Sequence, residues 1–318
     1  MPKTLLEYAD WLSGRDLIWP APPKPVPVTV ESHAKPLRGI RAVTWSVYGT
    51  LLRITDGRLL FRHSHPVRIQ VALEKTVREF NMWNSMYRKP GAPWEYLRRR
   101  YEHALEQQEL VPTPQVRDMA EVHTGQVWRK VIRELEHKDY RYDASFYGNL
   151  EEYGEKMAYF FHSALQGVEA APGALAAVTA VASSRVRQGL LADAQPFTPV
   201  QMLRAFREQG TLPPLADLFA PECSALSYQE GVRKPSPTLY ARCLERFDRL
   251  GIAPGEVLHV GSRVRDDLAA ARQAGMKTAL YADGVGLDAV PEQELDPEFE
   301  PDRVLTDLLQ IRDVLSLG

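Results

Sequence analysis

The chain has 318 residues, 44% of them hydrophobic and 25% charged, and a formal net charge of −2 at pH 7. These values exclude a disordered chain, a collagen-like repeat and a disulfide scaffold, and they predict an ordinary folded protein of about two domains. A charge so close to zero gives no broad field for a phosphodiester backbone, so we expect no nucleic-acid partner.

No segment of the sequence suits export or membrane insertion. Glu7 and Asp10 interrupt the N-terminal apolar residues where a signal peptide needs an unbroken run, and no stretch reaches the ~18 apolar residues of a membrane span. Cys223 and Cys243 form no zinc-binding pattern. We therefore expect a cytoplasmic protein with two free thiols and no membrane association.

Residues 4–19 predict a short amphipathic helix, because Leu5, Tyr8 and Leu12 recur at helical spacing. Five prolines follow within 20–27. Each proline ring fixes φ and disfavours the helical region for the residue before it, so an extended spacer is expected there.

Residues 1–37 are therefore expected to be an N-terminal arm outside the main domains. One interpretation is a strap that lies on the surface of the same chain. The other is a docking arm for a protein partner or a second subunit. Trp11 and Trp19 are the candidate anchors in both.

The remaining sequence alternates strand and helix patterns around one long helical block. A buried strand is expected at 42–47, and residues 61–167 form the helical block. Later strands are expected at 189–192, 223–226, 257–260 and 278–281, separated by helices at 199–209, 236–249 and 266–274. This order predicts an α/β protein with a doubly wound, mostly parallel sheet formed by residues 38–60 and 168–318, and with the helical block inserted as a cap.

Polar segments follow four of the expected strands, and ligands of such sheets bind at the carboxyl ends of the strands. These segments include Val-Tyr-Gly-Thr-Leu at 47–51, Ala-Asp-Ala-Gln at 192–195, Gly-Val-Arg-Lys-Pro-Ser-Pro at 231–237 and Gly-Ser-Arg-Val-Arg-Asp-Asp at 261–267. In this order, the chain resembles the haloacid dehalogenase-like hydrolase superfamily over roughly residues 38–315. The resemblance implies a Rossmann-like core with a mobile helical cap.

The sequence departs from this superfamily at positions that carry its chemistry. The resemblance places a nucleophilic Asp where this chain has Ser46, and a hydroxyl that binds the transferred group where it has Ala192. Ser262 replaces an Asp that helps to hold Mg²⁺ in the phosphatase members. Tyr48 occupies the acid/base position of those members. An unactivated serine needs a neighbouring base, and the sequence places no His or Lys beside Ser46.

Other site residues of the resemblance are retained. They are Gly49 and Thr50 in the first loop, Lys234 as a substrate-binding group, and Asp266 and Asp267 as the remaining metal candidates. Asp193, beside Ala192, is a further candidate for substrate binding, as a residue that could replace one of the missing acids. Lys234 has two interpretations: an ion pair with Asp267 that joins two loops, or a contact to a small phosphate or carboxylate anion.

Two functions follow from this mixed pattern. The favoured hypothesis is a protein of the hydrolase superfamily that lacks the usual Asp-nucleophile catalysis and has a binding, scaffold or regulatory role, with no cofactor. The alternative is an active phosphatase-type or dehalogenase-type hydrolase of a small phosphate ester or haloacid, which uses replacement residues and takes Mg²⁺ as its cofactor.

Overall fold

The centre of the protein is a parallel β-sheet. The computed structural model describes residues 1–24, 30–83, 91–282 and 300–317. Within these residues the sheet order is β10-β9-β8-β1-β5-β6, and every pair of neighbours is parallel. The strands are β1 (Ala42–Trp45), β5 (Arg187–Ala192), β6 (Ala225–Leu226), β8 (Val257–Gly261), β9 (Lys277–Tyr281) and β10 (Arg303–Leu305). The predicted doubly wound sheet is confirmed.

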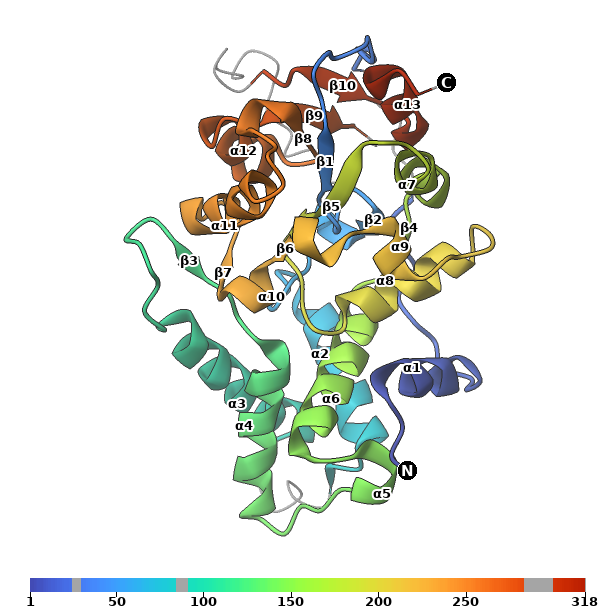
Figure 1. Ribbon diagram of the computed structural model, residues 1–318. Coiled ribbons are helices and arrows are strands. Elements are labelled where there is room, and N and C mark those ends of the chain that lie inside the picture. The colour runs from blue at the N-terminus through green and yellow to red at the C-terminus, as the bar shows by residue number, and fades with distance from the viewer. Residues whose placement is uncertain (25–29, 84–90, 283–299, 318) are drawn as a thin grey trace.

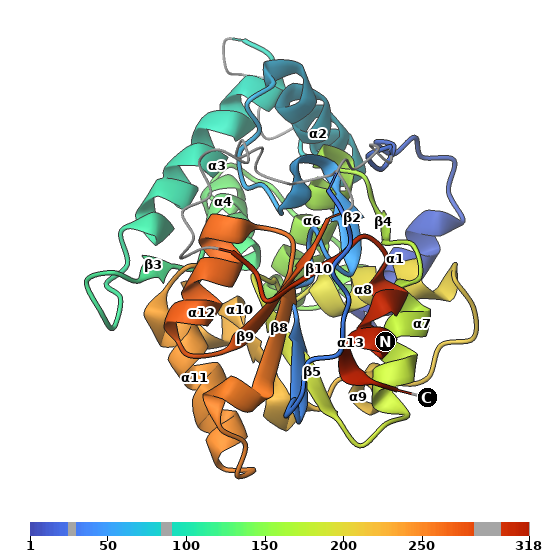
Figure 2. The same cartoon turned by 90° about the horizontal axis from the view of Figure 1, so that it is seen from above.

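Helices cover both faces of this sheet, as Figures 1 and 2 show. Because β1 and β8 are buried along their whole length, they consist mostly of apolar residues rather than alternating polar and apolar ones. The core helices are α7 (Ala174–Ala182), α8 (Thr198–Arg207), α9 (Leu215–Leu218), α10 (Ser227–Glu230), α11 (Pro237–Asp248), α12 (Ala270–Gln273) and α13 (Ile311–Leu315).

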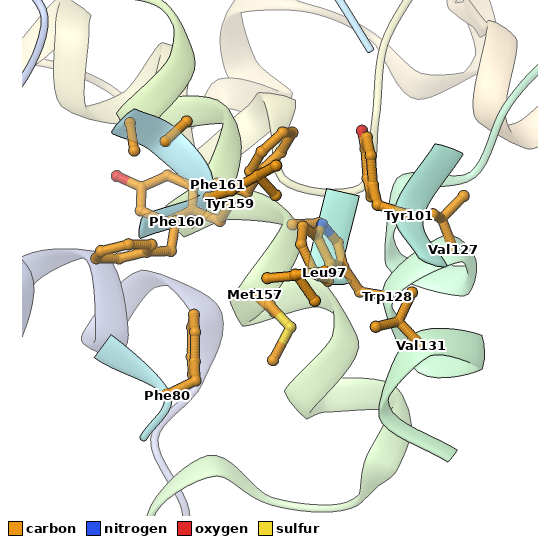
Figure 3. Packing of buried hydrophobic residues seen from close by; sticks show 14 of the residues in the cluster. Phe80, Leu97, Tyr101, Val127, Trp128, Val131, Met157, Tyr159, Phe160 and Phe161 are labelled. Carbon is orange, nitrogen blue, oxygen red and sulfur yellow. The ribbon is translucent and has the colours of Figure 1, made fainter. Parts of the chain in front are cut away.

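The inserted block is a helical cap with a hydrophobic core of its own. Its helices are α2 (Pro66–Glu79), α3 (Pro93–Glu109), α4 (Thr124–Glu136), α5 (Ala144–Tyr147) and α6 (Leu150–Leu165). The side chains between them are mainly aromatic and include Phe80, Leu97, Tyr101, Val127, Trp128, Val131, Met157, Tyr159, Phe160 and Phe161 (Figure 3). The same cluster includes Tyr8 of the N-terminal arm and Phe197 of the core, so it also packs the cap against its neighbours.

Helix α6 is the central helix of the cap and begins at a strong sequence signal. The Asn149 side chain accepts hydrogen bonds from the backbone N–H groups of Glu151 and Glu152, and Glu152 accepts one in return from the Asn149 N–H. This reciprocal cap satisfies N–H groups that the first turn of a helix leaves without partners.

Two short antiparallel strand pairs connect the cap to the core. Strand β2 (Leu52–Ile54) pairs with β4 (Val168–Ala170), where the chain leaves the core and returns to it. Strand β3 (Met119–Ala120) belongs to the cap and pairs with β7 (Val232–Arg233) of the core. The second pair holds a cap loop directly against the residue that precedes Lys234.

Gln195 strengthens this contact between cap and core. Its Oε1 accepts hydrogen bonds from the backbone N–H and the hydroxyl of Thr124, both at 3.0 Å, and its Nε2 donates to the Val122 carbonyl at 2.8 Å. Gln195 is buried, so these bonds are shielded from competing water.

The N-terminal arm lies on its own chain in its described part. Helix α1 (Leu5–Ser13) contacts α6 of the cap and α8 of the core (Figure 1). The Trp11 ring lies 4.9 Å from the ring of Phe146, and the Trp19 ring lies 5.3 Å from that of Phe160. A role of the arm toward a partner remains a prediction.

Several predicted elements differ from the observed ones. The helix predicted over 4–19 ends at Ser13, where Gly14 forms its C-cap, so the prediction is wrong beyond that residue. The strand predicted at 223–226 shortens to β6, because Pro221 opens a 3₁₀ turn that includes Cys223. The predicted helix over 266–274 begins two residues earlier, as a π-helical turn over Val264–Ala269, and continues as α12 over Ala270–Gln273.

One observed strand was not predicted, and parts of two predicted segments lie outside the described residues. Strand β10 was not predicted, because three residues are too few for a pattern. Residues 25–27 of the proline spacer and residues 288–299 of the acidic stretch 288–302 fall outside the described residues. Among the residues that are described, no helix combines the length and the hydropathy needed to cross a membrane.

Candidate active site

Four buried side chains meet at the carboxyl end of the sheet. Ser46 follows β1, Lys234 follows β7, His259 lies in β8, and Asp267 lies in the π-helical turn after β8. None of them is more than 4% exposed. The parallel arrangement of β1 and β8 explains why residues so distant in sequence converge at one edge.

Hydrogen bonds join these side chains into one cluster. Lys234 Nζ donates to Ser46 Oγ at 2.7 Å, and the Ser46 hydroxyl donates to Asp267 Oδ2 at 2.6 Å. Lys234 also forms an ion pair with Asp267 Oδ1. The predicted Lys234–Asp267 ion pair is thus present, and it includes the hydroxyl of Ser46.

His259 completes the cluster as a neutral imidazole. Burial, together with the charge of Lys234, lowers the pKa of His259. Its Nε2 lies 2.7 Å from Asp267 Oδ1, an acceptor, and 3.1 Å from Lys234 Nζ, a donor. Because the contact to the carboxylate is the shorter one, we place the imidazole proton on Nε2. Its Nδ1 then accepts from the hydroxyl of Thr44 at 2.8 Å.

The Asp267 carboxylate is the charge that organises the cluster. Burial alone would raise its pKa, but the charge of Lys234 and the adjacent His259 with its hydrogen bond hold the pKa of Asp267 well below its usual range. Asp267 is therefore ionised at neutral pH. One cation and one anion balance, so the cluster as a whole is neutral.

A cavity of about 310 Å³ opens above this cluster, between cap and core. Ser46 and Lys234 line its floor. Its walls include five further charged side chains from the core, Arg58, Asp193, Arg233, Arg263 and Asp266, and three from the cap, Arg62, Glu109 and Glu121. The volume is at the lower end of the range for small-molecule sites.

Most of these wall charges are paired. Arg62 lies 2.6 Å from Glu109, and Arg263 lies 3.0 Å from Asp193. Asp193 also accepts a hydrogen bond from the backbone N–H of Lys234 at 2.8 Å. Asp193, a predicted substrate-binding residue, is therefore in the cavity wall but is already occupied by two donors.

Glu121 differs from the other wall carboxyls. It is only 6% exposed, and burial, reinforced by the charge of Asp193, raises the pKa of Glu121 to about 8. At pH 7 this carboxyl is therefore mostly protonated. A protonated carboxyl can donate a hydrogen bond or a proton, which the ionised carboxylates around it cannot do.

The other predicted site residues lie around the cluster with different contacts. The Tyr48 hydroxyl bonds to Thr198 at 2.9 Å and to Gln201 at 2.6 Å on α8, so it has partners outside the cluster. Ala192 is buried at the end of β5. Gly49 has φ +83° and forms the turn after β1, and the hydroxyl of Thr50 has no hydrogen-bond partner among the described residues.

The residues present do not fit a magnesium ion. Mg²⁺ needs free oxygen ligands in octahedral geometry, usually including carboxylates. Both oxygens of Asp267 already accept from Lys234, His259 or Ser46, and Asp266 turns to Arg263 instead. Among the described residues no group of three His, Cys, Asp or Glu side chains could hold a metal.

The sequence prediction missed the base-like groups around Ser46. No His or Lys is adjacent to Ser46 in sequence, but Lys234 and His259 both contact it in space, with His259 Nε2 at 3.3 Å from Ser46 Oγ. His259 lies inside a buried strand, where a histidine among apolar residues could have been noticed. Glu121 and Arg263 had no sequence signal of their own.

Comparisons with known proteins agree with this architecture. Residues 231–311 match the family model described as HAD-hydrolase-like. The chain also resembles the crystal structure of a 2-haloacid dehalogenase from Pseudomonas syringae, with a TM-score of 0.51 and 22% identity over 87% of this chain and 98% of the other. At this identity the likeness shows the fold.

Two curated relatives are named as phosphatases. The chain is 29% identical over 147 residues to glyceraldehyde 3-phosphate phosphatase of Pyrococcus furiosus, which covers 46% of this chain and 54% of that protein. It is 38% identical over 79 residues to the protein of the same name from Methanopyrus kandleri, which covers 24% of this chain and 33% of the relative. The chain thus spans about half, or less, of the relatives that it matches.

Proposed function

Because the chain has the fold of the haloacid dehalogenase-like hydrolases and matches their family model over residues 231–311, we propose that it hydrolyses a small phosphate ester in the cavity between cap and core. The observation that carries this proposal is the position of the Ser46 hydroxyl. It faces the cavity while it accepts a hydrogen bond from Lys234 and donates one to Asp267. The names of the two curated relatives support a phosphate ester as substrate class.

Ser46 is the attacking group in this proposal. Its oxygen forms a bond to phosphorus while its proton passes to Asp267, the acceptor at 2.6 Å. The bond between phosphorus and the leaving alkoxide breaks, and Glu121 gives its proton to that oxygen. Lys234 stabilises the negative charge that develops on Ser46.

Water completes the reaction. It attacks the phosphorus of the phosphoserine and releases inorganic phosphate, and Ser46 regains its hydroxyl proton from Asp267. Glu121 takes back a proton from the attacking water. Every group then has its starting protonation state, so the cycle is balanced without a further reactant.

A specific observation favours a second function, the binding of a phosphate ester without turnover. The low pKa of Asp267 makes it a weak base for the Ser46 proton. The resemblance also expects carboxylates at positions 46 and 262, where this chain has serines. In this second function the neutral cluster only supports the base of the cavity, and the cavity binds the phosphate ester without hydrolysing it.

Phosphate release measured on a panel of three-carbon phosphate esters separates the two functions. Each ester is tested with Mg²⁺ and with EDTA, for the wild type and for S46D and the S46D/S262D double variant. Release by the wild type in EDTA is the expected result. If the wild type binds an ester without release and S46D/S262D releases phosphate in Mg²⁺, the second function is correct.

A further inference from the structure

The cations of the cavity are not equivalent. Lys234 is matched by Asp267, Arg62 by Glu109, and Arg263 by Asp193. Arg233 and Arg58 differ from these three, because no ion pair or hydrogen bond of either side chain is found within the described part of the chain. Arg58 is exposed to solvent, whereas Arg233 is half-buried, so Arg233 is the unpaired cation that the cavity encloses. No carboxylate of the described residues therefore neutralises its positive charge through an ion pair.

The surroundings of Arg233 hold it in place without neutralising it. Arg233 lies in β7, which is fixed by its pairing with β3 of the cap. Its guanidinium carbon lies 6.0 Å from the centre of the Phe61 ring, and its Nε is enclosed without a partner. Because β7 fixes the backbone of Arg233 and its Nε is enclosed, the two terminal nitrogens of its guanidinium are the atoms that can reach a ligand.

The charge of Arg233 acts on Glu121, where it partly opposes the effect of burial on the pKa of that carboxyl. Because burial raises the pKa of Glu121 to about 8, this carboxyl is mostly uncharged at pH 7. An uncharged neighbour does not cancel the guanidinium. Arg233 therefore places an uncancelled positive charge in the cavity wall beside the cap. On the floor of the cavity, the charges of Lys234 and Asp267 cancel.

We propose that Arg233 binds a second anionic group of the ligand, so that the substrate class is a small phosphate ester that also carries a carboxylate. This inference rests on the proposed function, in which the phosphate lies at Ser46 and Lys234. A guanidinium is suited to this task, because its planar N–H groups match the two oxygens of a carboxylate. The cavity volume of about 310 Å³ limits the ligand to a small molecule.

Two probes of equal carbon number test the inference. Glycerol 3-phosphate carries the phosphate alone, and 3-phosphoglycerate carries a carboxylate at the far end. Isothermal titration calorimetry at pH 7 compares their dissociation constants. We expect the wild type to bind 3-phosphoglycerate at least about tenfold more tightly, the effect of one charge-assisted hydrogen-bonded pair.

Variants then assign the preference to a residue. In R233M the two dissociation constants should converge. R99M makes the same change at an exposed position of α3 and should keep the wild-type ratio. If R233M does not fold by circular dichroism, R233K takes its place, since it keeps the charge but loses the two-pronged geometry. Its ratio should fall between those of the wild type and unity.

The outcomes distinguish this inference from the proposed function. A wild-type ratio that persists in R233M, or in R233K where that variant is used, overturns the role of Arg233. Equal binding of both probes by the wild type overturns the inference but leaves a phosphate-ester site. Binding of neither probe overturns both.

Discussion

Lys234 Nζ lies 2.7 Å from Ser46 Oγ, and both side chains are almost completely buried. In this cluster the hydroxyl of Ser46 accepts from a cation and donates to the carboxylate of Asp267. A serine at this position therefore leaves one cation and one anion in balance. A carboxylate in its place would add an uncompensated negative charge to a buried cluster.

The first prediction concerns the buried ion pair. K234M leaves the Asp267 carboxylate buried without its cation, and we expect the free energy of unfolding to fall by about 3–5 kcal/mol in urea denaturation. The double variant K234M/D267L removes both charges and should recover most of this loss. R242M removes one partner of the exposed Arg242–Glu245 pair and should change stability by only ~0–1 kcal/mol. A double variant as unstable as K234M would contradict the ion-pair account.

The second prediction concerns the pH dependence of stability. The pKa of Glu121 is raised in the folded state to about 8, from an ordinary value of about 4.3 in the unfolded chain. Between these values Glu121 keeps in the folded state a proton that it has lost in the unfolded chain, so its contribution to stability is fully present below about pH 4.3 and is lost as pH rises through 8. E121Q should remove up to ~1.4 kcal/mol per pH unit from this slope.

Urea denaturation at several pH values between 5 and 8 checks this slope. E106Q changes an exposed glutamate of α3 and is the matched control. It should leave the wild-type slope unchanged. If E121Q and the wild type lose stability in parallel, Glu121 is not the group that takes up the proton.

The third prediction concerns the turn after β1. A Cβ at Gly49 would lie 2.5 Å from both the Gly57 carbonyl oxygen and Ser262 Oγ, and the residue has φ +83°. Gly231 has a similar φ of +74° but no atom within 4 Å of its Cβ position. We expect G231A to lower the free energy of unfolding by roughly 1–2 kcal/mol, the cost of the left-handed conformation alone. G49A should lower it further, and equal losses would show that the crowding at Gly49 relaxes freely.

The fourth prediction concerns the contact between cap and core. Q195A removes the hydrogen bonds to Thr124 and to the Val122 carbonyl. We expect faster amide hydrogen exchange in the cap loop 119–124, because local opening no longer breaks these bonds. The exposed Gln229 supplies the control, Q229A. Unchanged exchange in Q195A would mean that the β3–β7 pairing alone holds the loop.

The sheet was predictable because its signals are local. Buried parallel strands are short apolar runs, and the helices between them show a clear 3.6-residue period. The missed elements lack such signals. Strand β10 has three residues, and the end of the first helix depends on how Gly14 caps it.

The candidate site was only partly predictable, because its chemistry depends on contacts across the chain. Ser46 directly precedes the Val-Tyr-Gly-Thr-Leu segment, and Lys234 lies within Gly-Val-Arg-Lys-Pro-Ser-Pro, so the sequence marks both residues. They are nevertheless 188 residues apart in sequence. His259 stands out as a histidine in an apolar strand, but it is separated from Ser46 by 213 residues, so no sequence pattern indicated that the two side chains meet. The protonation of Glu121 comes from burial between cap and core, which no short sequence window contains.

The most direct test of the account is phosphate release by S46A, measured in EDTA on the three-carbon ester that the wild type turns over fastest. The control is S183A, which removes an exposed serine hydroxyl bonded only to the Thr179 carbonyl. The account predicts that S46A loses several orders of magnitude in rate, as expected for removal of a nucleophile, and that S183A keeps the wild-type rate. Phosphate release by S46A at the wild-type rate would contradict the proposed role of Ser46.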